Sequence, residues 1–512
     1  MRNKNNLSIL RVLSTVLVLM LLVSIMPFQS NMAFAATNGD KENNDSPDKA
    51  NAIKVNTEYT GSFKSKNDED YFKFTVTKAG YVSATVTPKN GVTVFIDIFN
   101  EEGMTRVWWY NSQKYTTSKN PIPAGTYYVN VASIYEKTGN YSFKINFTAD
   151  SKLPGASRLW GQTALDTMAA ISKEFTSGNA GKTSTFAVVT TNSDYKDALA
   201  ASSIAGNLTA PVLMTDKNTL STQTKNELQR MKAGAVYIVG STNEVSKNVV
   251  NQIKSAGVSD VIRIDGKTAS KRAIEVGEEL MEGREGEGFY NVIIATSKSF
   301  KDALAIAPYS YWSESPILYT ESNGKLSNDT INFIKKAVVN RKHYEYNSKG
   351  VKVQALGKVL IVGGPLAVPT SVETQLKKAG VKAANISRVA GANGCETSLV
   401  IAEWASGKLK KGTGPKTGTL YKYCNINHVP EIWSRLRGYY VGVATGKNWK
   451  DALAGAALCG YYQSPLLITD GTNYTSSKFI KDNKKRIVKC FVFGGELAVS
   501  KAAYNNYAKA FK

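Results

Sequence analysis

Hydrophobic and polar residues alternate with a period of two through residues 37–150. The alternating runs lie between turn residues, at 70–76, 81–86, 92–99, 125–131 and 140–147. Because successive side chains of a strand point to opposite faces, each run predicts a strand with one buried face. We therefore predict an all-β sandwich or jelly roll over residues 37–150, with its boundary at Asp150–Pro154.

Residues 151–512 follow a different pattern. Amphipathic stretches near 164–175, 194–206, 221–232 and 245–256 alternate with short apolar runs at 185–190, 211–215, 235–239 and 260–264. This alternation predicts α/β units in which helices cover both faces of a parallel sheet. The expected arrangement is three-layered, of the flavodoxin-like or Rossmann-like type.

Three signatures recur in the same order along this part of the chain, which defines internal repeats. Arg-x-x-Gly begins at Arg158, Arg263 and Arg388; Lys-Asp-Ala-Leu begins at Lys196, Lys301 and Lys450; an apolar run ends at Gly240, Gly363 and Gly494. We predict three tandem α/β repeats at 151–262, 263–387 and 388–512. The second copy carries an insertion around 339–357, and the third carries one near 410–435.

The first 36 residues have the parts of a secretory signal peptide. Arg2, Lys4 and Arg11 accompany an apolar run from 12 to about 28, and Ala33-Phe-Ala35 follows it. We predict cleavage after Ala35 or Ala36. An uncleaved anchor helix is the alternative. No later run reaches spanning length, so we expect a secreted or surface-bound protein without a transmembrane segment after cleavage.

Basic residues are concentrated in the repeats. The chain has 64 Lys and Arg against 41 Asp and Glu, a net charge of +23. Residues 37–150 are neutral, whereas residues 151–512 hold 48 basic and 28 acidic residues, and the third repeat alone holds 19 and 7. Such a field favours a polyanionic partner. Export makes nucleic acid the least favoured partner, behind an anionic wall polymer or an acidic membrane.

The repeated charged residues are candidate site residues with two interpretations each. Asp197, Asp302 and Asp451 stand three residues after good helix caps, which predicts a capping box, yet they also lie where open α/β folds bind ligands. Each anchor arginine (Arg158, Arg263, Arg388) ends a strand-like run before a glycine. It is expected to bind an anion or to pair with a carboxylate of a neighbouring unit.

The three copies resemble the type 2 cell-wall-binding repeat of Gram-positive surface proteins. The resemblance covers residues 155–512 and rests on Arg-x-x-Gly, Asp-Ala-Leu, the Pro-led apolar runs at Pro211, Pro316 and Pro465, and the Gly-Gly signature. It implies that three units pack as a compact triangle and hold the protein non-covalently on an anionic secondary wall polymer. Surface-layer proteins are further implied partners. The polymer-binding candidates are Arg158, Arg263, Arg388, Lys196, Lys301, Lys450, Asp197, Asp302 and Asp451.

Residues 43–149 look like the bacterial pre-peptidase C-terminal domain, a β-sandwich module. The match rests on Asp68-Glu-Asp-Tyr-Phe-Lys-Phe and Pro123-Ala-Gly-Thr-Tyr-Tyr. Relatives of that domain often bind calcium, and the oxygen ligands offered here are Glu42, Asp45, Asp68 and Asp70. A solvated acidic loop is the alternative, and no other cofactor is expected.

The favoured hypothesis is a non-enzymatic surface protein that grips the wall through its repeats and displays, or is assisted by, the sandwich. One alternative is a wall hydrolase or protease, with Cys424, His428 and Glu431 as its best candidate site. Another is an adhesin acting through the sandwich. Four cysteines (Cys395, Cys424, Cys459 and Cys490) allow three disulfide pairings between which the sequence does not decide.

Overall fold

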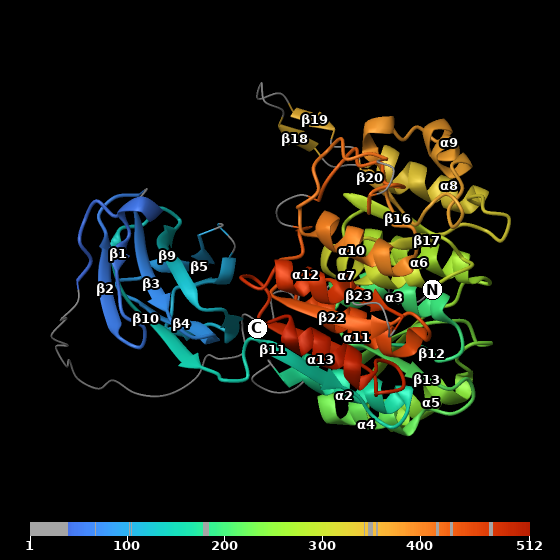
Figure 1. The fold of residues 1–512 in the computed structure, drawn as a ribbon, viewed down its shortest axis with the longest axis horizontal. Coiled ribbons are helices and arrows are strands. Elements are labelled where there is room, and N and C mark those ends of the chain that lie inside the picture. The colour runs from blue at the N-terminus through green and yellow to red at the C-terminus, as the bar shows by residue number, and fades with distance from the viewer. Residues whose placement is uncertain are drawn as a thin grey trace.

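The computed structural model describes residues 39–66, 68–101, 103, 105–177, 184–341, 344–346, 352–354, 357–415, 419–430, 434–470 and 475–511. The predicted signal segment lies outside these ranges. Within them, no helix is both long enough and apolar enough to span a bilayer. Figure 1 separates an N-terminal β region on the left from a larger α/β region on the right.

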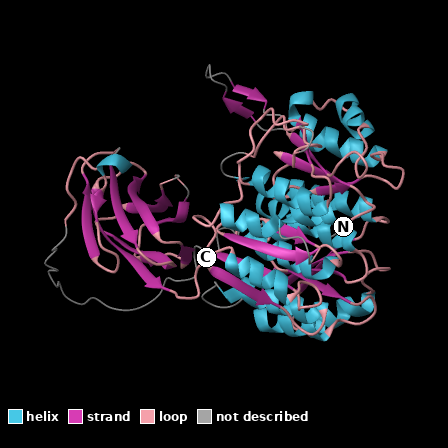
Figure 2. Cartoon of the chain, in the orientation of Figure 1, coloured by secondary structure: helices cyan, strands magenta, loops and turns pink. Residues whose placement is uncertain are grey.

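The N-terminal region is built from two sheets, the magenta strands at the left of Figure 2. One sheet has the order β1-β3-β9-β5-β6, and the other has the order β2-β10-β4-β7 with β8 paired to β4. The strands are β1 (Asn51–Ala52), β2 (Glu58–Phe63), β3 (Glu69–Val76), β4 (Gly80–Pro88), β5 (Thr93–Asn100), β6 (Thr105–Asn111), β7 (Tyr115–Thr116), β8 (Asn120–Ile122), β9 (Gly125–Ile134) and β10 (Gly139–Ala149). Pairing is antiparallel except between β1 and β3.

Both sheets contribute to one hydrophobic core. In β3 the inward positions are taken by Phe72, Phe74 and Val76, two residues apart, and β4 and β5 contribute Val86 and Ile96 in the same way. The five strands predicted from this alternation are confirmed by β3, β4, β5, β9 and β10. β2 was not predicted, because Phe63 is its one fully buried residue and the strand therefore lacks an alternation of buried and exposed positions.

The C-terminal region contains three four-stranded parallel sheets. The first has the order β13-β12-β14-β15, the second β17-β16-β20-β21, and the third β23-β22-β24-β11. Their strands are β11 (Gly155–Leu159), β12 (Phe186–Thr191), β13 (Val212–Thr215), β14 (Ala235–Val239), β15 (Asp260–Ile264), β16 (Asn291–Ala295), β17 (Ile317–Tyr319), β20 (Lys358–Val362), β21 (Ile386–Val389), β22 (Tyr440–Thr445), β23 (Leu466–Thr469) and β24 (Lys489–Phe493). The predicted parallel-sheet repeats are thereby confirmed.

Helices surround these sheets in Figure 2. They are α2 (Ala164–Ser177), α3 (Tyr195–Asn207), α4 (Thr222–Met231), α5 (Lys247–Ser255), α6 (Ala269–Glu282), α7 (Lys301–Ser313), α8 (Asn328–Ile334), α9 (Ser371–Lys378), α10 (Gly394–Ala405), α11 (Trp449–Tyr461), α12 (Thr475–Asp482) and α13 (Lys501–Lys509). The three Lys-Asp-Ala-Leu helices, α3, α7 and α11, contact one another in pairs. Tyr311 of α7 fits there because Gly206 of α3 and Gly460 of α11 leave it room.

The sheets divide the chain differently from the predicted repeats. Strand β11 opens the predicted repeat 151–262, but it pairs in parallel with β24 and completes the third sheet, with Leu159 opposite Phe493. The boundaries at 262/263 and 387/388 likewise cut through β15 and β21. The first strand of the repeat region therefore closes the last sheet, so the sheets do not coincide with the predicted repeats.

The two insertions are built differently. The second repeat's insertion contains the hairpin β18 (Tyr344–Tyr346) and β19 (Lys352–Gln354). The third repeat's insertion returns to the edge of the second sheet, where the backbones of Arg388 and Asn425 exchange N–H···O bonds of 2.8 and 3.0 Å. Trp404 Nε1 also donates to the His428 carbonyl at 3.1 Å. The insertion thus covers an edge that would otherwise expose unpaired backbone.

Candidate functional site

The aspartates of the Lys-Asp-Ala-Leu signature join neighbouring sheets. Asp197 is fully buried and accepts a 2.7 Å hydrogen bond from Arg272 Nε on α6. Burial raises the pKa of the Asp197 carboxyl, and the Arg272 guanidinium opposes that rise. Since α3 lies on the first sheet and α6 leads into the second, this ion pair spans what we call the first junction.

The second and third junctions repeat this contact with a neutral partner. Asp302 of α7 bonds the Thr397 side chain of α10, and Asp451 of α11 bonds the Thr167 side chain of α2. Burial raises the pKa of both carboxyls, that of Asp451 to about 6. Arg272, Thr397 and Thr167 each stand six residues after an anchor-motif glycine, so the three junctions are equivalent.

The capping box predicted for these aspartates is wrong. Asp194 and Asn448 cap their helices directly, accepting from the N–H groups of Lys196 and Lys450 at 3.0 and 3.1 Å. The carboxyls of Asp197 and Asp451 are therefore not needed as caps, and they contact the helix of the neighbouring unit. Because the three aspartates are at least nine-tenths buried, the structure gives them a junction role in place of the predicted polymer contact.

The anchor arginines hold the glycine loop of their own sheet. Arg158 donates to the carbonyls of Gly494 and Val499 at 2.7 and 2.8 Å. Arg388 does the same to Gly363 and Val368 at 2.7 and 2.9 Å.

In the first sheet Arg263 makes one such hydrogen bond, donating to the Gly240 carbonyl at 2.6 Å. Arg388 also pairs with Glu373 at 2.9 Å, a carboxylate at the start of α9 beside the same sheet. The Arg388–Glu373 ion pair joins the predicted third repeat to the predicted second repeat, as one of the two expectations for the arginines has it. Arg388 is buried, whereas polymer contact by Arg158 and Arg263 remains a prediction.

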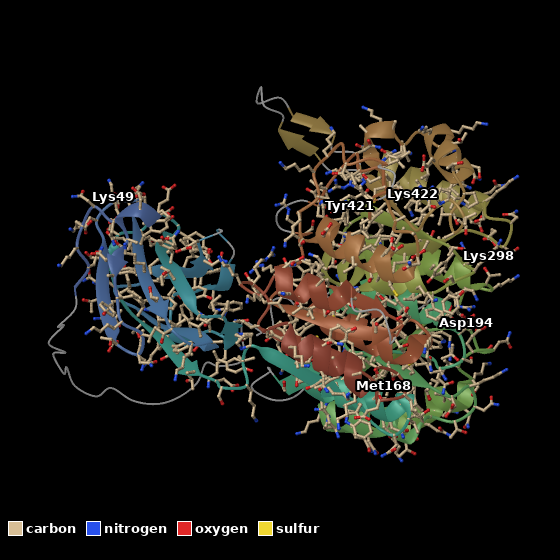
Figure 3. All side chains as sticks on the ribbon, in the orientation of Figure 1. Lys49, Met168, Asp194, Lys298, Tyr421 and Lys422 are labelled. Carbon is tan, nitrogen blue, oxygen red and sulfur yellow. The ribbon has the colours of Figure 1, made fainter. Side chains whose placement is uncertain are left out.

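The three signature lysines have different surroundings. Lys196 Nζ lies 2.9 Å from Asp194 and 5.1 Å from the centre of the Tyr195 ring. Lys450 Nζ lies 5.9 Å from the centre of the Trp449 ring. Lys301 is exposed at the second junction. Asp194 and Lys298, near the starts of α3 and α7, lie on the same side of the α/β region in Figure 3.

A cavity of about 290 Å³ opens at the second junction, which we call the junction groove. It is bounded by the start of α7, the first turn of α10, and the carboxyl ends of β22 and β23. The lining residues are Lys301, Asn393, Gly394, Cys395, Gly446, Lys447, Ile468, Thr469 and Asp470. Carboxyl ends of parallel strands are the usual ligand sites of open α/β folds.

Small residues keep this groove open. A Cβ on Gly394 would lie 2.7 Å from the Lys301 side chain, and one on Gly446 would lie 2.8 Å from the Ile468 side chain. At the first junction the equivalents of Gly394, Gly446 and Ile468 are alanine, serine and Tyr319. Tyr319 is buried and donates to the Lys196 carbonyl at 2.7 Å.

The third junction is filled in another way. Its equivalents of Gly394 and Gly446 are alanine and asparagine, and Met214 takes the place of Ile468. Met214 is buried in the core, and its backbone N–H lies 2.9 Å from the sulfur of Met168. The three sequence-equivalent places therefore differ in the residues that line them.

Charge in the junction groove favours an anion. Lys301 and Lys447 are both exposed, and the first turn of α10 adds the positive end of a 12-residue helix. Asp470 is the one carboxylate among the lining residues. Burial, as the largest cause, raises the pKa of the Cys395 thiol, which keeps it neutral. The groove suits a carboxylate or phosphate carried by a larger molecule.

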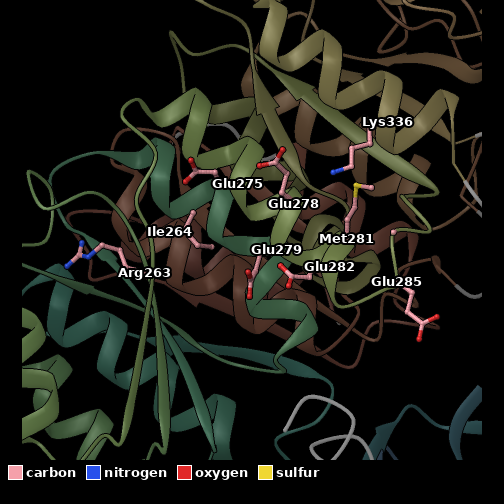
Figure 4. A pocket seen from close by; sticks show the side chains of 10 residues that line it. Arg263, Ile264, Glu275, Glu278, Glu279, Met281, Glu282, Glu285 and Lys336 are labelled. Atoms are coloured by element: carbon pink, nitrogen blue, oxygen red, sulfur yellow. The ribbon is translucent and has the colours of Figure 1, made fainter. Parts of the chain in front are cut away.

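A second cavity has the opposite character. It measures about 640 Å³ and lies beside α6, where Figure 4 shows several glutamates and Arg263 around it. The charged lining residues are Arg263, Glu275, Glu278, Glu279, Glu282, Glu285 and Lys336. Five carboxylates against two cations make this cavity unsuitable for a polyanion.

The four acidic residues predicted as calcium ligands lie close together in the N-terminal region, and Asp40 lies beside them. Ligand oxygens of Asp40, Glu42 and Asp70 lie within 4.8 Å of one another, and so do those of Glu42, Asp45 and Asp68. Asp40 was missed because it stands beside the signal segment.

The cluster fits a hard cation. Asn44 and Asp70 are fully buried, and the Oδ1 atom of each has no hydrogen-bond partner. Burial raises the pKa of the Asp70 carboxyl to about 8, although the Tyr141 hydroxyl donates to its Oδ2 at 2.6 Å. Oxygen donors of this kind are those that calcium takes, so the residues present suit the predicted ion.

The residues of the hydrolase alternative are bound into the fold. Cys424 is buried and its Sγ donates to the Ala390 carbonyl at 3.3 Å. His428 is buried with Nε2 3.2 Å from the Val359 carbonyl. Glu431 lies outside the described residues. All four cysteines are free thiols in this structure, which answers the open question of their pairing.

Three segments of the chain match the model of cell wall binding domain 2, at residues 158–250, 263–373 and 388–504. Among curated proteins, the N-acetylmuramoyl-L-alanine amidase LytC of Bacillus subtilis (strain 168) is 27% identical over 348 residues, covering 68% of this chain and 57% of its own. The amidase enhancer of the same organism is 26% identical over 327 residues, covering 63% and 37%. The chain thus spans 57% and 37% of the lengths of these relatives.

Two solved structures share the fold. Cwp6 from Clostridium difficile has a TM-score of 0.58 at 17% identity and covers 86% of this chain and 68% of its own. Cwp8 from the same organism has a TM-score of 0.53 at 17% identity, covering 83% and 64%. The family match extends over more than half of the chain and coincides with the recurring signatures and the three parallel sheets. The chain therefore belongs to the cell wall binding domain 2 family and is a cell-wall-associated surface protein.

Proposed function

We propose that the α/β region holds the protein non-covalently on an anionic polymer of the cell wall, and that the junction groove receives one anionic group of that polymer. The observation that carries this proposal is the groove itself. It combines Lys301, Lys447 and the start of α10 around a space large enough for a carboxylate or phosphate with part of its sugar. Larger residues than Gly394 and Gly446 stand at the equivalent positions of the other two junctions.

The distribution of charge supports the same proposal. The N-terminal region is neutral, whereas residues 151–512 carry a net charge of +20. A field of this size concentrates a polyanion around the α/β region before any specific contact forms. Binding should weaken steeply with salt, as counterion release requires for charged polymers.

The finer organisation is part of the proposal. A signal peptide at 1–36 would direct export, and the N-terminal region would act as a displayed or assisting β-sandwich of the pre-peptidase C-terminal type. Calcium would be held by Asp40, Glu42, Asp45, Asp68 and Asp70, where it would neutralise clustered carboxylates and tie the segment before β1 to β3. Surface-layer proteins are proposed as neighbours on the wall.

We propose a binding role without turnover. The candidate nucleophile Cys424 bonds the carbonyl of Ala390, just after β21, and the candidate base His428 bonds the carbonyl of Val359 in β20. The relatives are named as an amidase and an amidase enhancer, and this chain spans about half or less of their lengths. A role beside a wall-degrading enzyme is therefore the second candidate, tested by assaying wall lysis with and without this protein.

Sedimentation of the full chain with purified walls tests the main proposal. We expect retention on intact walls and release from walls whose anionic polymer has been stripped chemically. Lys447→Glu should reduce retention about tenfold, because it reverses a charge inside the groove. Lys298→Glu is the matched control, since Lys298 is exposed at the equivalent position of the closed first junction. Equal retention on stripped walls would refute the proposal.

A further inference from the structure

The glycine loops of the second and third sheets each present a fully exposed leucine. Leu366 and Leu497 have exposed fractions of 102% and 103%, and they occupy the same position, two residues after the second glycine of the loop. The first sheet has Asn243 there. Two equivalent loops therefore present the same apolar side chain to solvent.

An aromatic ring lies over the second glycine of each of these two loops. Trp160 Cε3 is 3.5 Å from the place where a Cβ on Gly495 would be, and Tyr423 Cγ is 3.8 Å from the corresponding place on Gly364. Each ring therefore packs on backbone, and Trp160 still exposes 50% of its surface. The first sheet has Ser241 in place of the second glycine.

The two rings reach this common position from different parts of the chain. Trp160 directly follows β11, whereas the residue equivalent to it beside the second sheet is Ala390. There the third repeat's insertion supplies Tyr423 instead. The residues that follow Tyr423 fix the insertion to the second sheet, because the Cys424 Sγ donates to the Ala390 carbonyl and the backbone of Asn425 pairs with that of Arg388. The position of Tyr423 is thus fixed before any ligand binds.

The chemistry of these surfaces fits a sugar ring. An aromatic face is apolar and electron-rich, so it packs against the C–H face of a pyranose. Lys422 Nζ lies 5.1 Å from the centre of the Tyr423 ring, which adds a cation where an acidic sugar would lie. A stable protein partner would need about 800 Å² of contact on each side, far more than one ring and one leucine offer.

The Tyr423 surface is close to the junction groove. Gly363, just before Gly364, approaches the Asp302 carboxylate, and Lys301 beside Asp302 lines the groove. A linear polymer with one anionic group in the groove can therefore continue toward this ring.

We propose that Tyr423 with Leu366, and Trp160 with Leu497, form two stacking subsites for neutral faces of sugar rings in the anionic wall polymer. This inference rests on the proposed function and gives the third repeat's insertion a part in it. Stacking adds affinity that does not depend on charge, in contrast to the groove lysines. The first unit, with Asp265 and Asn243 at these positions, has no such subsite.

The test is titration of the full chain with the anionic polysaccharide released from purified walls, at several salt concentrations. We expect Tyr423→Ala and Trp160→Ala each to weaken binding by about five- to tenfold while leaving the salt dependence unchanged. Tyr423→Phe and Trp160→Phe should keep most of the affinity. Trp109→Ala is the matched control, because Trp109 is 45% exposed in the N-terminal region.

The outcomes separate this inference from the proposed function. If the unaltered protein fails to bind the polysaccharide, the proposed function itself fails. If it binds, and both alanine variants bind equally well with unchanged unfolding temperatures, the stacking subsites are refuted. Loss of binding through a reduced salt dependence would also refute them, because it would mean that the rings act on charge.

Discussion

The first junction between the α/β sheets is closed by a buried ion pair, whereas the second and third are joined by an aspartate and a threonine. Asp197 meets Arg272 at the first, and Asp302 and Asp451 meet Thr397 and Thr167 at the others. The same signature therefore supports two kinds of contact. The junction groove lies at a junction whose aspartate has a threonine partner, so binding and the ion pair occupy different places.

Removing the carboxylate from the first junction should have the largest effect. Asp197→Asn leaves the Arg272 guanidinium buried, with Glu244 at 3.5 Å as its remaining carboxylate. Breaking a buried pair in this way costs about 3 kcal/mol. We expect a clear fall in the unfolding temperature by calorimetry. A variant as stable as the unaltered protein would show that the ion pair does not hold the junction.

The equivalent change at the third junction should act in the opposite direction. The pKa of Asp451 is raised to about 6 from an ordinary value of 3.8, so its ionised form costs stability. The contribution of the protonated Asp451 carboxyl to folding stability is therefore complete below pH 3.8, and it is lost as the pH rises through about 6. Asp451→Asn should therefore stabilise the protein at pH 8 by about 3 kcal/mol and change little at pH 4. Unfolding temperatures across pH 4–8 measure this, and a variant less stable at pH 8 would contradict it.

Filling the junction groove should weaken binding of the polymer. Gly446→Asn introduces the residue found at the third junction, and Ile468→Tyr introduces the one found at the first. Each should weaken polymer binding about tenfold, measured by sedimentation with walls. Met214→Ile, at the filled third junction, should leave binding unchanged. Full binding by both filled variants would place the anionic group elsewhere.

Calcium should have the smallest effect, and it is confined to the N-terminal region. Millimolar calcium is expected to raise the unfolding temperature of that region, by about 1 kcal/mol of stability if the site has the affinity of extracellular modules. Because the pKa of Asp70 is raised to about 8, binding at pH 7 should release protons. Asp45→Asn is the matched variant. No response in calorimetry would assign the cluster to a solvated loop.

Local patterns predicted the elements well. The period-two runs gave β3, β4, β5, β9 and β10, and the α/β alternation gave the first sheet and its helices within two residues. The closing position of β11 was not predicted, because Gly155–Leu159 carries no local mark that distinguishes the third sheet from the first.

The candidate site was predicted less well. Asp197 looked like a capping residue, but its partner Arg272 lies 75 residues away and no short spacing reveals it. Aligning the copies on their anchor glycines would have placed Thr167, Arg272 and Thr397 together, which is a signal in the sequence. The groove was beyond such reasoning, because it depends on atoms absent from Gly394 and Gly446 and on how three elements meet.

The role of the junction groove is tested by the affinity of the full chain for the anionic wall polysaccharide, measured across a salt series for Lys447→Glu and Lys298→Glu. We expect Lys447→Glu to lose about tenfold in affinity and to have a smaller salt dependence, whereas Lys298→Glu should stay close to the unaltered protein. Equal losses in the two variants would contradict it, since the polymer would then sense the overall charge and not the junction groove.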